Sequence, residues 1–95
     1  MHMIANHGGH AVLILPRGQE WHVVNEVLRN VGIRPCATDR PFGIEVSLSE
    51  LQRRQVAGEM KRMAVSARQR HRWGYAAILS RWAWLLHDPE GQGGT

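Results

Sequence analysis

The first third of the chain changes from a short apolar run to a longer segment with helical spacing. Residues 10–15 are almost entirely apolar and lie between Gly9 and Pro16, which is typical of a short strand buried on both faces. Residues 19–31 repeat apolar side chains at helical spacing, and Gly32 follows where a helix commonly ends in a left-handed residue. This pattern predicts a strand followed by a helix.

The middle of the chain contains one segment with a strand pattern and, before it, a segment whose pattern is ambiguous. Residues 33–42 are ambiguous, since an edge strand there would be weakened by Pro35 before a polar turn. Residues 43–48 alternate strictly between apolar and polar side chains, which predicts a half-buried strand. The end of this strand overlaps a capping box formed by Ser47 and Glu50, so we expect a helix to begin there.

Residues 48–86 permit two interpretations. They contain no proline, and their apolar seam advances in steps of three or four residues without a change of phase, which predicts one helix of about 38 residues, about 57 Å long. A mean helix is only about 11–12 residues long. That favours two packed helices, with the break near Ser66 or Gly74. Both interpretations stay open. The seam consists of Val56, Met60, Met63, Ala67, His71, Gly74, Ile78, Trp82 and Leu85.

These elements together predict an α+β fold. We expect a small sheet of two or three strands, packed on an N-terminal helix and on a long C-terminal helix or helix pair. A chain of 95 residues fits one domain, which we place at residues 10–87. Residues 1–9 are expected to form a flexible lead-in, and residues 88–95, which contain a proline and three glycines, a disordered tail.

The positive charge of the chain is concentrated in one segment. Residues 53–72 carry a net charge of +6, whereas residues 1–46 sum to zero. On a continuous helix four of these cations would form a basic stripe within about 40° of one another, which suits a phosphate backbone. The predicted basic stripe consists of Arg54, Lys61, Arg68 and Arg72. The alternative is an ordinary solvated helix face. The candidate nucleic-acid-binding or anion-binding residues are Arg54, Lys61, Arg62, Arg68, Arg70 and Arg72.

The last predicted helical segment is apolar around nearly its whole circumference. Trp73, Ala77 and Trp84 fall outside the face that would pack on a core, and they flank Arg81. Because Trp and Arg are enriched in interface hot spots, we predict that these four residues form a protein interface. The alternative is a tightly wrapped core helix.

Few residues suggest metal binding or catalysis. His7 and His10 have a plausible ligand spacing, but neither a cysteine nor a carboxylate cluster accompanies them, so we predict no metal site. Cys36 has no recognisable general base, and no phosphate-binding glycine loop is present. We therefore expect neither an enzyme nor a cofactor. The longest apolar stretch, about 14 residues, is too short for a membrane span of about 20. The single cysteine favours a cytoplasmic location.

These observations support three functional hypotheses. In the first, the chain is a small regulatory protein that forms a homodimer and binds nucleic acid, or a nucleic-acid-bound complex, through its basic helix face. In the second, it is an inhibitor or modulator of the kind that phages and mobile elements use, and its Trp-rich C-terminal helix binds a host protein or ribonucleoprotein complex. In the third, it is a structural subunit that oligomerises. None of the three involves a membrane.

Overall fold

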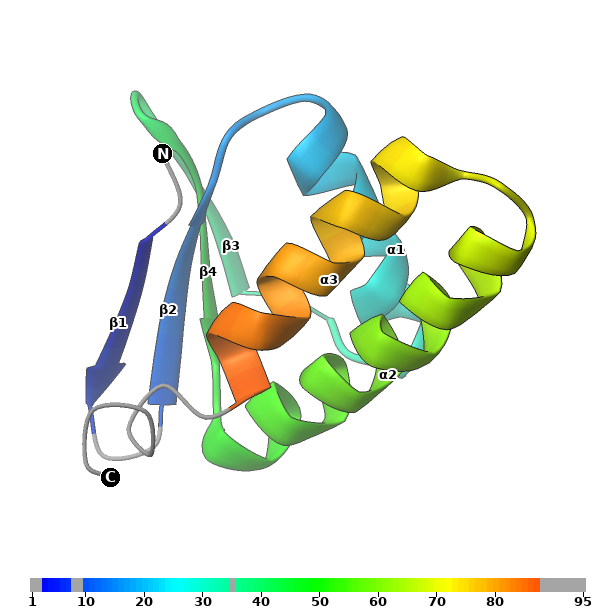
Figure 1. The fold of residues 1–95 in the computed structure, drawn as a ribbon. Helices are drawn as coiled ribbons and strands as arrows, with labels where there is room; N and C mark the ends of the chain where they lie inside the picture. Colours follow the sequence, from blue (N-terminus) through cyan, green and yellow to red (C-terminus); the bar gives the residue numbers. More distant parts are fainter. Residues whose placement is uncertain (1–2, 8–9, 35, 88–95) are drawn as a thin grey trace.

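The structure, a computed structural model, describes residues 3–7, 10–34 and 36–87, and these residues form an α+β fold, as predicted. The strands make one layer, and all three described helices cover the same face of it (Figure 1). The elements are β1 (Met3–His7), β2 (His10–Leu15), α1 (Gln19–Asn30), β3 (Cys36–Arg40), β4 (Gly43–Leu48), α2 (Glu50–Gln69) and α3 (Trp73–His87).

The sheet has the strand order β1-β2-β4-β3, and each neighbouring pair is antiparallel. It contains four strands rather than the two or three predicted, because residues 3–7, which the sequence pattern leaves in a flexible lead-in, form β1. The pairing of β1 runs from Met3 opposite Ile14 to His7 opposite His10. A strand whose own residues show a weak strand pattern can be stabilised by pairing with its neighbour. The residues of the strand alone do not reveal that stabilisation. The predicted tail, residues 88–95, lies outside the described residues.

Each central strand buries only one of its faces. In β2, Leu13 and Leu15 are completely buried toward the helices, whereas Val12 and Ile14 on the other face are partly exposed. The prediction that this strand is buried on both faces is wrong, because the described helices form a layer on one side only (Figure 1). The alternation predicted for residues 43–48 is confirmed in β4, where Val46 and Leu48 are buried and face the same side.

The helix α1 ends as the sequence predicts, at a left-handed glycine. Gly32 has φ 75°, and its N–H donates to the carbonyl of Arg29. The N–H of Ile33 donates to the carbonyl of Leu28, which completes a Schellman motif. This turn directs the chain away from α1 toward the edge strand β3. The segment before β4 that is ambiguous in the sequence therefore does contain a strand, β3.

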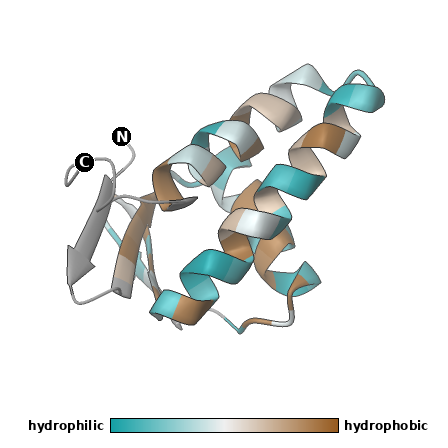
Figure 2. Ribbon diagram, turned by 60° about the horizontal axis from the view of Figure 1, so that its bottom comes forward, coloured by the Kyte–Doolittle hydropathy of each residue, from teal (hydrophilic) through white to brown (hydrophobic). Residues whose placement is uncertain are grey.

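The segment after β4 forms two helices that fold back on each other. The helix α2 begins at a capping box of Ser49 and Gln52, two residues later than the predicted pair. It ends at Gln69, and α3 begins at Trp73. The helices are antiparallel, and hydrophilic and hydrophobic residues alternate along α2 (Figure 2). At one end, buried Arg53 of α2 donates from Nη1 to the carbonyl of Leu86 in the last turn of α3 at 2.6 Å.

The break between α2 and α3 is a second Schellman motif, built without glycine. His71 occupies the left-handed position with φ 59°. Its N–H donates to the carbonyl of Arg68, and the N–H of Arg72 donates to that of Ala67. The interpretation as a helix pair is therefore confirmed, and the break falls between the two sites that the sequence suggests. The apolar seam keeps its spacing in the sequence across this break. It is not one continuous packed surface in the structure, because His71 is exposed at the turn.

Two further sequence predictions concern membranes and metals. No helix among the described residues is long and apolar enough to cross a membrane. No group of three or more His, Cys, Asp or Glu side chains in the described part of the chain is placed to hold a metal ion. The side chains of His7, His10 and Cys36 lie outside the described residues.

Candidate binding surfaces on the helical hairpin

The antiparallel pair of α2 and α3, here named the helical hairpin, divides the predicted basic stripe between two sides of the molecule. The prediction that Arg72 lies on the same helix face as Arg54 and Lys61 is wrong. It assumes one continuous helix, whereas α2 ends at Gln69. One set of cations turns away from the sheet, and the other lies beside α1. The first set is Arg54, Lys61 and Arg68, and the second is Arg62, Arg70 and Arg72.

The side of the hairpin that points away from the sheet is here named the outer face. Helical spacing places every third or fourth residue of each helix on it, and most of these residues are exposed. Trp73 and Trp84 of α3 are 61% and 62% exposed, and Leu51 and Val65 of α2 are 66% and 50% exposed. The outer face consists of Leu51, Arg54, Lys61, Val65 and Arg68 of α2 with Trp73, Ala77, Ser80 and Trp84 of α3.

A groove of about 370 Å³ runs between α2 and α3 on the outer face. Its lining combines two small buried side chains, Ala64 and Ala83, with the exposed Val65 of α2 and the exposed Trp84 of α3. None of the described residues that line the groove is acidic. The lining residues are Lys61, Ala64, Val65, Arg68, Ser80, Ala83 and Trp84.

Cations of α2 border this groove, and two outer-face cations are held by neighbouring side chains. The guanidinium of Arg68 donates to the Oγ of Ser80 at 2.8 Å, across the space between the helices. Arg54 forms an ion pair with Glu50 one turn earlier, at 2.9 Å. The antiparallel packing thus brings part of the predicted anion-binding set next to the predicted interface residue Trp84.

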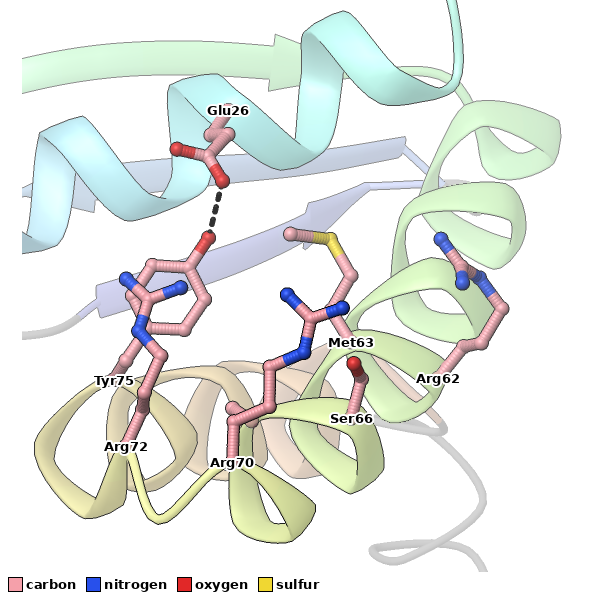
Figure 3. A pocket seen from close by; sticks show the side chains of 8 residues that line it. Glu26, Arg62, Met63, Ser66, Arg70, Arg72 and Tyr75 are labelled. Atoms are coloured by element: carbon pink, nitrogen blue, oxygen red, sulfur yellow. Dashed lines mark hydrogen bonds between the residues drawn. The ribbon is translucent and has the colours of Figure 1, made fainter.

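A second hollow of about 150 Å³ lies between α1, the end of α2 and the start of α3 (Figure 3). We name it the arginine pocket. Arg70 and Arg72 extend toward α1 from the two ends of the turn, and Arg62 lies at the side (Figure 3). The pocket is lined by Glu26, Arg62, Met63, Ser66, Ala67, Arg70, Arg72 and Tyr75.

Tyr75 organises one wall of the arginine pocket. Its hydroxyl donates to the carboxylate of Glu26 on α1 at 2.6 Å, and the guanidinium of Arg72 lies 4.2 Å from the centre of its ring. Burial, followed by the hydrogen bond and the charge of Glu26, raises the pKa of Tyr75 to about 12. On the other side, Arg62 pairs with Glu59, and this hydrogen bond holds the pKa of the Glu59 carboxyl below its ordinary value.

The other predicted interface residues separate in the structure. Trp73 and Ala77 share the outer face with Trp84, whereas Arg81 turns toward α1 and forms an ion pair with Glu20. Sequence reasoning did not identify Val65 or Ser80 as groove residues, nor Tyr75 and Glu26 as a pair. Only Val65 carries a local signal, because it is an apolar residue within the polar face of α2.

Comparisons of the chain with protein-family models, with curated proteins and with solved structures gave no match. The function is therefore inferred from the chemistry of the two surfaces on the hairpin.

Proposed function

We propose that the protein is a binding protein whose outer face docks an acidic, amphipathic helix of a partner protein. The observation that carries this proposal is the groove that exposed Val65 and Trp84 line together with Lys61 and Arg68. An amphipathic helix lays its apolar side chains into such a groove and places its charged side chains along the rim. We place this interaction in the cytoplasm, in keeping with the single cysteine.

The distribution of exposed apolar side chains supports a protein partner. Five large hydrophobic side chains are exposed among the described residues, and four of them lie on the outer face. Single exposed hydrophobic residues are common, but a group of them on one face is typical of an interaction site. Trp84 at the groove would serve as an anchor, since tryptophan is over-represented among the residues that carry binding energy.

The charge of the groove supports an acidic partner over a second copy of this chain. In a symmetric dimer the same patch lies on both subunits, so Lys61 and Arg68 of one copy would lie near those of the other. Like charges brought together at an interface oppose association, whereas carboxylates on a partner would pair with these cations. The homodimer predicted from the sequence would therefore use another surface.

Nucleic acid is the weaker alternative for the outer face. Phosphates would pair with Lys61 and Arg68, but a phosphate backbone offers little apolar surface to cover Leu51 and Val65. Successive cations of this face are seven residues apart on α2, which is about 10.5 Å along a helix. An inhibitor or modulator that occupies an acidic surface of a host protein fits the apolar and basic residues together.

Selection of peptides from a random display library on the folded protein tests the proposal. We expect the recovered peptides to combine acidic residues with apolar residues at helical spacing. Replacement of Lys61 and Arg68 by Glu, or of Trp84 by Ala, should weaken their binding at least tenfold. The matched control is Arg29→Glu on α1, which changes the same charge at an exposed site and should have little effect.

Two results would overturn this proposal. One is the recovery of peptides without the acidic and apolar pattern, or of peptides whose binding ignores the outer-face variants. The other is tighter binding of a short DNA or RNA oligonucleotide with the same dependence on Lys61 and Arg68, which would assign the outer face to nucleic acid.

A further inference from the structure

The turn between α2 and α3 presents two guanidinium groups to one small hollow. Arg70 and Arg72 flank His71, and the hydrogen bonds of the Schellman motif fix the backbone of all three residues. Both side chains then extend toward α1, with their guanidinium groups over the arginine pocket (Figure 3). Two like charges held by a rigid turn create a local excess of positive potential.

Neighbouring acidic groups neutralise this charge only in part. Arg62 is paired with Glu59, and Glu26 accepts the hydroxyl of Tyr75. Arg72 lies over the ring of Tyr75. Within the described part of the chain, the guanidinium of Arg70 has no hydrogen bond or ion pair with a protein group. Its planar fork of N–H donors is therefore available to an oxyanion.

Other groups around the pocket also favour an anion. Ser66 contributes a partly buried hydroxyl to the lining. The helix α3 starts beside the pocket and has no acidic residue of its own in its first turn, so its positive end also favours an anion. Glu26 acts in the opposite direction, because its carboxylate repels an anion. The balance is favourable only for a ligand that engages Arg70 and Arg72 together.

The size of the hollow sets the size of the bound group. Its volume of about 150 Å³ exceeds the space that one water needs and is smaller than the roughly 300–1,000 Å³ of sites for drug-sized ligands. We propose that the arginine pocket binds the phosphate group of a small phosphomonoester, with Arg70 and Arg72 as its charged ligands. A phosphate dianion matches two guanidinium groups in charge, and its tetrahedral oxygens can reach donors on several sides. The organic part of the ligand would project from the open mouth.

This inference is independent of the proposed function, because the arginine pocket and the outer face share no lining residue. Binding of a peptide at the outer face and binding of a phosphate here can therefore succeed or fail separately.

Titration of the isotopically labelled protein with inorganic phosphate, and then with a nucleoside monophosphate, tests the proposal by NMR. We expect the Nε–H signals of Arg70 and Arg72 to shift and to saturate, and chloride at equal ionic strength to have no such effect. Arg70→Gln should weaken phosphate binding about tenfold or more, since it removes a charge-assisted contact. Arg54→Gln on the outer face is the matched control and should leave the affinity unchanged.

The variant Glu26→Gln distinguishes an anion-binding role of the arginine pocket from a purely structural role. The amide still accepts the hydroxyl of Tyr75 but removes the repelling charge, so phosphate binding should become tighter. Tighter binding of the monophosphate than of inorganic phosphate would support a phosphomonoester ligand, and the reverse order would overturn it in favour of free phosphate. The proposal is overturned if Arg70→Gln binds phosphate as the wild type does. It is also overturned if an oligonucleotide without a terminal phosphate binds more tightly through Arg70 than either small ligand.

Discussion

The residue that most directly tests the helical hairpin is His71, because it holds a backbone conformation that favours glycine. It lies at φ 59° between α2 and α3, where it reverses the chain. His71→Gly and His71→Ala both remove the imidazole and its edge-on contact with Trp73, whose ring centre is 5.5 Å away. The difference between the two variants therefore reports on the backbone alone.

The expected magnitude follows from the cost of this conformation. A residue with a Cβ pays about 1–2 kcal/mol in the left-handed region, and glycine does not. Glycine loses more conformational freedom on folding, which offsets part of that gain. We expect the glycine variant to be about 1 kcal/mol more stable than the alanine variant. At Gly58, in the exposed interior of α2, an added Cβ meets nothing within 4 Å, so Gly58→Ala should instead stabilise by about 1 kcal/mol.

Urea denaturation followed by circular dichroism measures both comparisons. Opposite preferences at the two sites, with glycine favoured at position 71 and alanine at position 58, are the expected result. If alanine is favoured at both positions, residue 71 belongs to a continuous helix. The division of the cations between the outer face and the arginine pocket would then be wrong.

Three further predictions concern the packing that supports the two surfaces. Gly43→Ala should destabilise the protein by about 1–3 kcal/mol, because the added Cβ would lie 2.5 Å from a backbone oxygen of β2; a loss below this range in urea denaturation would contradict that close approach. Arg53→Met should cost about 1.5–3 kcal/mol in the same assay, because the carbonyl of Leu86 loses a charged donor, and an unchanged stability would show that the contact contributes nothing. Ultraviolet titration should give Tyr75 a pKa of about 12, and Glu26→Gln should lower this pKa without restoring the ordinary value of 10.0, since burial is the larger cause. Because the folded-state pKa of Tyr75 is the higher one, its contribution to stability is present below about pH 10 and is lost as the pH rises toward 12; a tyrosine that titrates near 10 would contradict this account.

The sequence predicts those elements whose signals are local. Gly32 ends α1 as expected, because a glycine after an apolar helical segment is a common stop. The alternation in β4 likewise follows from one face packing on the helices. The strand β1 has only one local signal, the paired glycines Gly8-Gly9 that are typical of a hairpin, and its stability depends on pairing with β2.

The candidate sites could not be predicted fully, because they depend on one turn that has no recognisable signal. His71 occupies a position that glycine usually takes, so the sequence does not mark the end of α2. The three-residue connection also leaves the apolar seam in phase, which makes two helices resemble one. The turn brings Lys61 beside Trp84 within the hairpin, and the packing of the hairpin on α1 brings Arg70 and Arg72 beside Glu26. Both sites therefore join residues of separate helices.

The indole N–H signal of Trp84 reports whether the outer face binds an acidic amphipathic helix. An acidic amphipathic peptide recovered by selection should shift the NMR signals of Trp84 and of the Val65 methyl groups as it binds. The signals of Trp21 on α1 should stay in place, since this side chain belongs to the packing around the core. Saturable binding of that peptide with no change at Trp84 and Val65 would contradict the account.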